Sequence, residues 1–132
     1  MGKYAETIER LLHKGRFQQR TFDTLVQADG RAFGPLVKAL SSHPDQNVRE
    51  ICAEILARRG SAKAIPSLIE ALADHSLAVR QDALWAIESI CLMQPFALLD
   101  WLDAEFEDGA ELQSKVREWW QCNKRFIENI TA

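Results

Sequence analysis

The sequence predicts an all-α fold, an α-α superhelix of about four stacked helix hairpins, and two observations carry this prediction. Pro35 recurs as Pro66, and Val48-Arg49 recurs as Val79-Arg80, so the offset is 31 residues at both anchors. A fixed period of this size is typical of solenoids built from helix pairs. At 132 residues, the chain is long enough to bury a core without help from a metal or a disulfide.

Apolar residues recur at helical spacing in both copies of the pattern. Because one face of each helix must be buried, we expect the two helices of a copy to pack as a hairpin and each hairpin to pack on its neighbour. The apolar faces of the second helices consist of Val48, Ile51, Cys52, Ile55 and Leu56 in one copy and of Val79, Ala83, Ala86, Ile87 and Ile90 in the other.

The pattern predicts a single domain over residues 1–132 with four parts. These are an atypical N-terminal helix pair at 1–30, two clear repeats at 31–60 and 61–91, and an extended C-terminal capping repeat at 94–131. In the first part, Leu11 and Leu12 are expected to continue the first helix. Terminal repeats of solenoids are usually atypical because one of their faces meets water.

Glycines and short polar residues mark the predicted helix ends. Gly15, Gly30 and Gly60 follow helical stretches and are predicted to end them, because glycine adopts the left-handed conformation found after many helices. Asp45 and Ser61 are predicted N-caps, since their side chains can accept hydrogen bonds from the first free amides of a helix.

The last part departs from the regular repeat. Pro95 leads into what is predicted as the first helix of a third repeat, and the helix that carries Val116-Arg117 is its delayed second helix. Trp119 and Trp120 are expected to close the C-terminal core, with one of them partly exposed because adjacent helical positions cannot share a face.

Charge is distributed unevenly along the chain. Residues 1–63 carry eleven Lys and Arg against seven Asp and Glu, a balance of +4, whereas the remainder carries five against twelve, a balance of −7. The total of −3 argues against nucleic-acid binding, which requires clustered positive charge. The polarity is compatible with a charged partner or with head-to-tail self-association, and equally with solvated helix faces that have no binding role.

Neither disulfides nor a membrane anchor are expected. Cys52, Cys91 and Cys122 are widely spaced and odd in number, so they are interpreted as small buried hydrophobic residues. No stretch approaches the roughly 20 apolar residues of a membrane span, and the N-terminus lacks the apolar core of a signal peptide. We therefore expect a cytoplasmic protein.

The segment Ile65–Asp74, IPSLIEALAD, followed by Val79–Ile87, VRQDALWAI, resembles the HEAT repeat, and is most similar to its short bacterial, phycobilin lyase-type variety. The resemblance implies the solenoid fold and a binding role. It also implies that Arg49, Arg80 and Arg117 brace neighbouring repeats.

Signatures of catalysis are missing from the sequence. It contains no phosphate-binding loop, dinucleotide fingerprint, nucleophile elbow or paired metal-binding histidines. His13, His43 and His75 are not followed by Glu, unlike the His-Glu pairs of di-iron relatives of this family. His43 and His75 are assigned to the turns instead. We therefore predict that the protein is not an enzyme and needs no cofactor or metal.

Two surfaces are candidates for binding another protein. The first is the groove lined by the second helices, where we place Glu50, Glu54, Arg58, Gln81, Trp85 and Glu88. Trp85 stands at the position of Glu54 in the preceding repeat, and an aromatic side chain among charges is typical of a binding hot spot. The second candidate is the acidic turn that contains Glu105, Glu107 and Asp108.

The leading hypothesis is a non-catalytic scaffold or adaptor that binds a partner protein through this groove. Two alternatives stay open: an auxiliary of the phycobilin lyase type or small-ligand carrier, which follows from the resemblance, and an inhibitor or immunity-type protein whose acidic end covers a basic site. The sequence does not identify the partner, the pathway or the oligomeric state.

Overall fold

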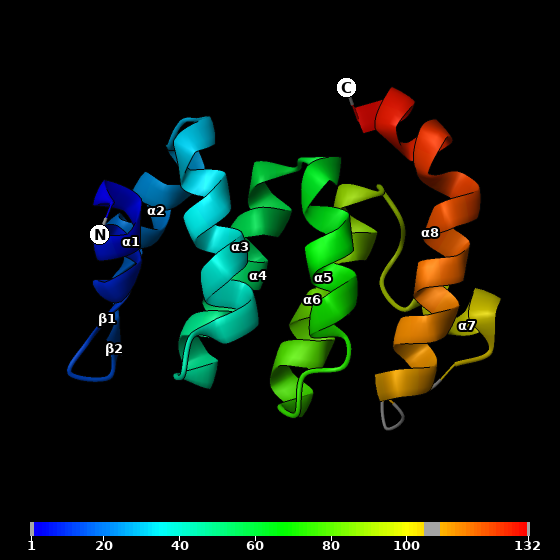
Figure 1. Ribbon diagram of the computed structural model, residues 1–132, viewed down its shortest axis with the longest axis horizontal. Helices are drawn as coiled ribbons and strands as arrows, with labels where there is room; N and C mark the ends of the chain where they lie inside the picture. Colours follow the sequence, from blue (N-terminus) through cyan, green and yellow to red (C-terminus); the bar gives the residue numbers. More distant parts are fainter. Residues whose placement is uncertain (1, 105–108, 132) are drawn as a thin grey trace.

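In the computed structural model, which describes residues 2–104 and 109–131, helix hairpins stand side by side along one axis (Figure 1). These ranges contain eight α-helices and one two-stranded hairpin, which confirms the all-α prediction. The elements are α1 (Lys3–Glu9), β1 (Leu12–His13), β2 (Arg16–Phe17), α2 (Gln19–Gln27), η1 (Gly30–Ala32), α3 (Phe33–Ser42), α4 (Gln46–Arg59), η2 (Ala62–Ala64), α5 (Ile65–Ala71), α6 (Leu77–Ile90), α7 (Ala97–Leu102) and α8 (Gly109–Thr131), where η denotes a 3-10 helix.

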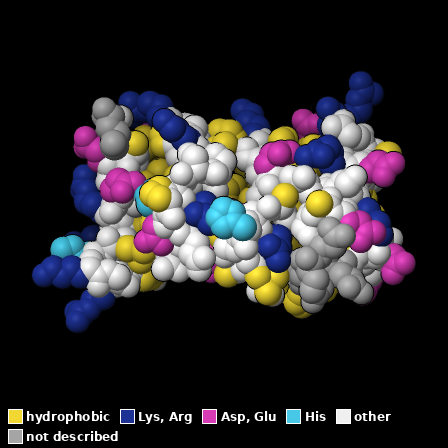
Figure 2. All heavy atoms as spheres, turned by 60° about the horizontal axis from the view of Figure 1, so that its bottom comes forward, with side chains coloured by type: hydrophobic (Ala, Val, Ile, Leu, Met, Phe, Trp, Pro, Cys, Tyr) yellow, Lys and Arg dark blue, Asp and Glu magenta, His cyan; other side chains and the backbone are white. Residues whose placement is uncertain are grey.

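The connection between α1 and α2 contains a short β-hairpin. Helix α1 ends before Leu11, and β1 pairs antiparallel with β2, with Leu12 opposite Phe17. Lys14 and Gly15 turn the chain with φ angles of 51° and 77°, as two-residue hairpin turns require. The predictions that Leu11 and Leu12 continue the helix and that Gly15 ends it are therefore wrong. In Figure 2, Lys and Arg side chains gather at the end that carries this hairpin.

Capping residues fix the ends of the central helices. The Asp45 carboxylate accepts a hydrogen bond from the Asn47 amide at 2.9 Å, and Gly60 ends α4 in the left-handed conformation, so both predictions are confirmed. Ser61 caps η2, the 3-10 turn that precedes α5. Gly30 does not end a helix, because it begins the equivalent 3-10 turn η1.

The first three hairpins form two layers of helices. Helices α1, α3 and α5 pack in one layer, and α2, α4 and α6 pack in the other, with the closest packing between α4 and α6. In Figure 1, α3 and α5 lie in front of α4 and α6. The second helices therefore form a continuous face.

Helix α8 leaves this order, because it packs against α5 and η2 in the layer of the first helices. The Gln113 amide donates to the carbonyl oxygen of Ile69 at 3.3 Å, and Arg117 pairs with Glu70 at 2.7 Å, both at the end of α5. The last turns of α8 lie beside η2 at the beginning of α5, so the two helices run antiparallel (Figure 1). The prediction that α8 is the delayed second helix of a third repeat is wrong in its layer, because α8 packs beside α5 and does not continue the row of α2, α4 and α6.

A single core cluster of buried apolar residues runs through the hairpins. Cys52 and Cys91 are buried within it, and burial raises the pKa of each thiol to about 12. Cys122 is exposed on α8, contrary to prediction. Trp120 is buried and Trp119 is half-buried, which confirms the prediction that the two tryptophans differ in exposure.

Candidate protein-interaction surface

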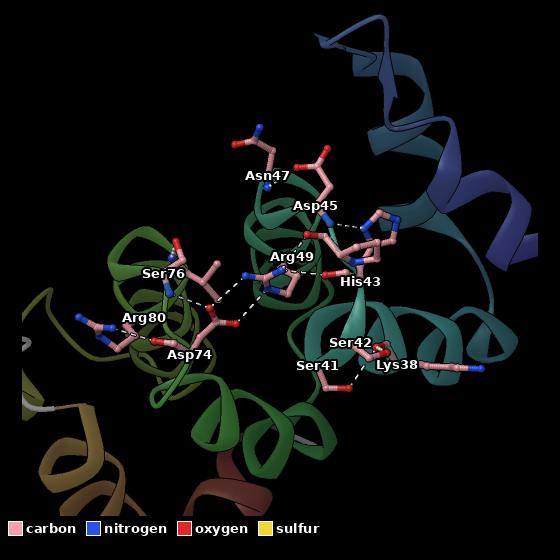
Figure 3. Close-up of polar contacts among 12 residues, drawn as sticks. Lys38, Ser41, Ser42, His43, Asp45, Asn47, Arg49, Asp74, Ser76 and Arg80 are labelled. Atoms are coloured by element: carbon pink, nitrogen blue, oxygen red, sulfur yellow. Dashed lines mark hydrogen bonds and ion pairs between the residues drawn. The ribbon is translucent and has the colours of Figure 1, made fainter.

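An arginine brace holds the second helices α4 and α6 in register (Figure 3). The Arg49 guanidinium donates to both Asp74 oxygens, at 3.0 and 3.2 Å, and to the carbonyl oxygen of His43 at 2.8 Å. Burial alone would raise the pKa of Asp74, but hydrogen bonds from Arg49 and from the Ser76 amide, together with the Arg49 charge, lower it. The ion pair is buried, so Arg49 has the structural role that the resemblance implied.

The other residues with predicted structural roles lie in, or contact, the turns that precede α4 and α6. Arg80 donates to the carbonyl oxygen of Asp74 at 2.7 Å. His43 accepts a hydrogen bond from the Asp45 amide at 3.1 Å, and its other ring nitrogen lies 2.8 Å from Glu9, so its predicted turn role is confirmed. His75 is exposed in the corresponding turn before α6.

The residues predicted to line the groove differ in exposure. Arg58, Gln81 and Trp85 are exposed, whereas Glu50 and Glu54 are half-buried. These five residues share the face formed by α4 and α6, which the brace aligns. We call this surface the second-helix face.

Trp85 is the apolar centre of the second-helix face. Its side chain is 39% exposed and lines a cavity of about 260 Å³ together with Leu84, Pro95 and Phe96. Gln81 forms part of the same cavity. Asp82 and Glu88 complete the lining, so the cavity joins an apolar wall to polar groups. A partly exposed tryptophan beside such a cavity can receive an apolar side chain from a partner without rearrangement of the fold.

Glu88 was expected on this face, but the structure buries it to 2% exposure. Its carboxylate accepts hydrogen bonds from the backbone amides of Phe96 and Leu98, each at 3.1 Å. Burial nevertheless raises the pKa of Glu88, because these two bonds only partly offset the loss of hydration. Glu88 therefore fixes the first turn of α7 to the end of α6, and it forms part of the wall of the cavity beside Trp85 without being exposed on the face.

Asp82 belongs to the second-helix face, although the sequence analysis did not include it among the site residues. Burial, followed by repulsion from Glu50 and Glu54, raises the pKa of Asp82 to about 6. Arg58 offsets part of this charge, since it pairs with Glu54 at 3.3 Å while its guanidinium lies 5.7 Å from the centre of the Phe22 ring. The face is therefore apolar at Trp85 and acidic beside it.

The second candidate surface lies largely outside the described residues. Glu105, Glu107 and Asp108 are outside the described residues, so their geometry is not described. Asp103 precedes them, and its carbonyl oxygen accepts a hydrogen bond from Lys115 at 2.7 Å.

The family follows from a comparison with known proteins. The HEAT repeats family matches residues 34–108, more than half of the chain. The chain belongs to this family. No match was found among curated proteins or among solved structures.

HEAT repeats commonly serve as protein-interaction scaffolds and are generally not catalytic. Across residues 2–104 and 109–131, no three His, Cys, Asp or Glu side chains lie together in a way that could hold a metal ion. No α-helix in the same ranges combines the length and the apolar character needed to cross a membrane. The match spans α3 to α7, and therefore includes the second-helix face.

Proposed function

We propose that this HEAT-repeat protein is a non-catalytic scaffold that binds a partner protein through the second-helix face. The observation that carries the proposal is Trp85, which is 39% exposed beside a cavity whose other lining includes Leu84, Pro95 and Phe96. Tryptophan is enriched among the residues that dominate binding energy, especially where it meets a pocket. We therefore assign Trp85 as the apolar anchor for the partner.

The charges around Trp85 support a choice of partner by electrostatics. Glu50, Glu54 and Asp82 place carboxylates on one side of the anchor, and the charge of Arg58 is already shared with Glu54. Charge complementarity mainly sets specificity and the rate of association. We propose that the partner presents an apolar side chain to Trp85 and basic side chains to these carboxylates.

Affinity capture from the native host tests this proposal, with wild type compared with Trp85→Ala. Leu77→Ala is the matched control, because Leu77 is an exposed apolar residue on the same helix. A captured partner should then be purified and titrated by calorimetry. We expect Trp85→Ala to weaken binding by about tenfold or more, as hot-spot truncations do, with Leu77→Ala unchanged.

A further variant separates the two candidate surfaces. If neutralising Glu105, Glu107 and Asp108 abolishes binding while Trp85→Ala has no effect, the acidic turn is the binding surface and the proposal is wrong. If wild type retains a pigment or another small molecule but no protein, the ligand-carrier alternative replaces the scaffold. The phycobilin lyase-type variety, a bacterial origin and a cytoplasmic location stay predictions from the sequence.

A further inference from the structure

A second apolar surface lies at the C-terminal end of the molecule, and its lining shares no residue with the cavity beside Trp85. It is a groove of about 460 Å³ between α7, α8 and the segment that follows α6. Four large apolar side chains line it while remaining well exposed: Leu92 at 75%, Trp101 at 67%, Phe126 at 64% and Ile130 at 43%. We call this surface the terminal groove.

The composition of the terminal groove is that of an interface core. Its lining consists of Cys91, Leu92, Met93, Gln94, Ala97, Trp101, Trp119, Asn123, Phe126, Ile127 and Ile130, and none of these residues is charged. Interface cores are depleted in charge and enriched in aromatic residues and methionine. Contiguous exposed apolar patches of this kind generally mark an interaction surface.

The exposed area is of the size that a protein interface requires. Taking full areas of about 150–250 Å² for these large side chains, the four exposed residues present roughly 500 Å². A standard interface buries about 800 Å² on each partner, so this patch supplies more than half of one side. It also lies in the upper part of the range for the largest patch of an ordinary monomer, about 300–600 Å².

We propose that a second copy of this chain covers the terminal groove, so that the protein forms a symmetric dimer through α7 and α8. Both helices line the groove, and a two-fold axis that runs along it between them would place α7 of one copy against α8 of the other. Trp101 and Phe126 then protrude from each copy toward the hollow of the other. An uncharged lining is compatible with its own copy, since no like charges meet in the centre.

The rims of the terminal groove fit the same arrangement. Asp100 is exposed on α7 next to Trp101, and Arg125 is exposed on α8 next to Phe126. The exposed charged residues around Phe126 on α8 are Lys124, Arg125 and Glu128, which together carry a net positive charge. Under this two-fold axis, Asp100 of one copy would lie toward that part of α8 of the other. A strongly charged partner would instead find no counter-charge in the lining.

Sedimentation velocity of the full chain tests the dimer. Reductant is needed because Cys122 is exposed and can form an adventitious disulfide. Samples from about 1 to about 200 μM cover the range in which a dimer of micromolar Kd dissociates. Wild type should sediment as a dimer, whereas Trp101→Glu and Phe126→Glu each place a charge in the interface and should raise the dimer Kd at least about 100-fold.

Leu77→Glu is the matched control, because it adds the same charge at an exposed apolar position outside the terminal groove. It should leave the dimer unchanged. Circular dichroism verifies that each variant folds, and Leu92→Glu replaces any variant that does not. A wild type that is monomeric over the whole range overturns the proposal, as does a dimer that none of the groove variants weakens. Longer open assemblies would also overturn it, since a two-fold interface closes at two copies.

Discussion

Replacing Asp82 with asparagine is expected to stabilise the protein at neutral pH. Burial and the carboxylates of Glu50 and Glu54 raise the pKa of Asp82 from 3.8 to about 6 in the folded protein. A shift of this size corresponds to about 3 kcal/mol against the ionised form, at 1.36 kcal/mol per pKa unit. Because Asp82 is only half-buried, solvent screens part of this penalty, and we expect a gain of about 1–2 kcal/mol from Asp82→Asn.

The gain should depend on pH in a defined direction. The folded state binds the Asp82 proton more tightly than the unfolded state does, so ionisation of Asp82 lowers the free energy of unfolding as pH rises from about 4 to about 6. At pH 7 the carboxyl group is ionised in both states and the penalty is complete. Near pH 3 it is neutral in both states, so Asp82→Asn should then have almost no effect.

Urea unfolding followed by circular dichroism measures this difference at pH 7, 5 and 3. Glu118→Gln is the control, because Glu118 is exposed on α8 and its removal changes the net charge equally. Glu50→Gln should stabilise wild type but have a smaller effect when Asp82 is already asparagine. Equal midpoints for wild type and Asp82→Asn at pH 7 would refute the electrostatic reasoning, and an equal gain at pH 7 and pH 3 would assign the effect to packing.

Two further predictions concern the contacts that hold the hairpins together. Arg49→Met should lower the free energy of unfolding by about 3 kcal/mol, because it leaves the buried Asp74 carboxylate without its charge partner, and Asp74→Asn should restore part of the loss in the same urea assay. Gly109→Ala should lower the melting temperature, since the new Cβ would lie 2.8 Å from the carbonyl oxygen of Leu72 and force α8 away from α5. Gly34 lies on α3 with open space around it, so Gly34→Ala should leave the melting temperature unchanged or raise it. Equal changes of melting temperature for the two glycine variants would contradict this reasoning.

The central hairpins were predictable from the sequence because their signals are local. The 31-residue offset aligned α3 with α5 and α4 with α6, and helical periodicity identified their buried faces. Asp45 and Gly60 marked the beginning and the end of α4, since capping depends on side-chain chemistry and backbone conformation within one turn. The brace between Arg49 and Asp74 followed from the resemblance and not from the residues alone.

The position of α8 was not predictable in this way. Its apolar stripe, which includes Val116, Trp120 and Ile127, shows which face is buried but not which neighbour buries it. The helix that precedes it, α7, has only six residues and begins after Phe96 in the left-handed conformation. No local sequence rule predicts that conformation for phenylalanine, because residues other than glycine adopt it only when surrounding contacts enforce it.

The burial of Glu88 did have a signal in the sequence. Subtracting the repeat offset of 31 residues aligns Glu88 with Ala57, which is buried, and not with the exposed Arg58. A carboxylate at a buried position requires donors, and the backbone amides of Phe96 and Leu98 supply them. Asp82 had a comparable signal, because it stands at the position of an isoleucine in the preceding repeat.

The position of α8 also explains why a cavity exists beside Trp85. On α4, Glu50 lies toward α6, as its repulsion of Asp82 shows. The equivalent position on α6 is Gln81, which would face the next second helix in a regular array. Because α8 packs in the other layer, the segment containing Pro95 and Phe96 lies at this place, and a cavity of about 260 Å³ is left. If the proposed partner presents a helix, that helix would pack against α6 as α6 packs against α4, and would extend the second-helix layer of the described residues.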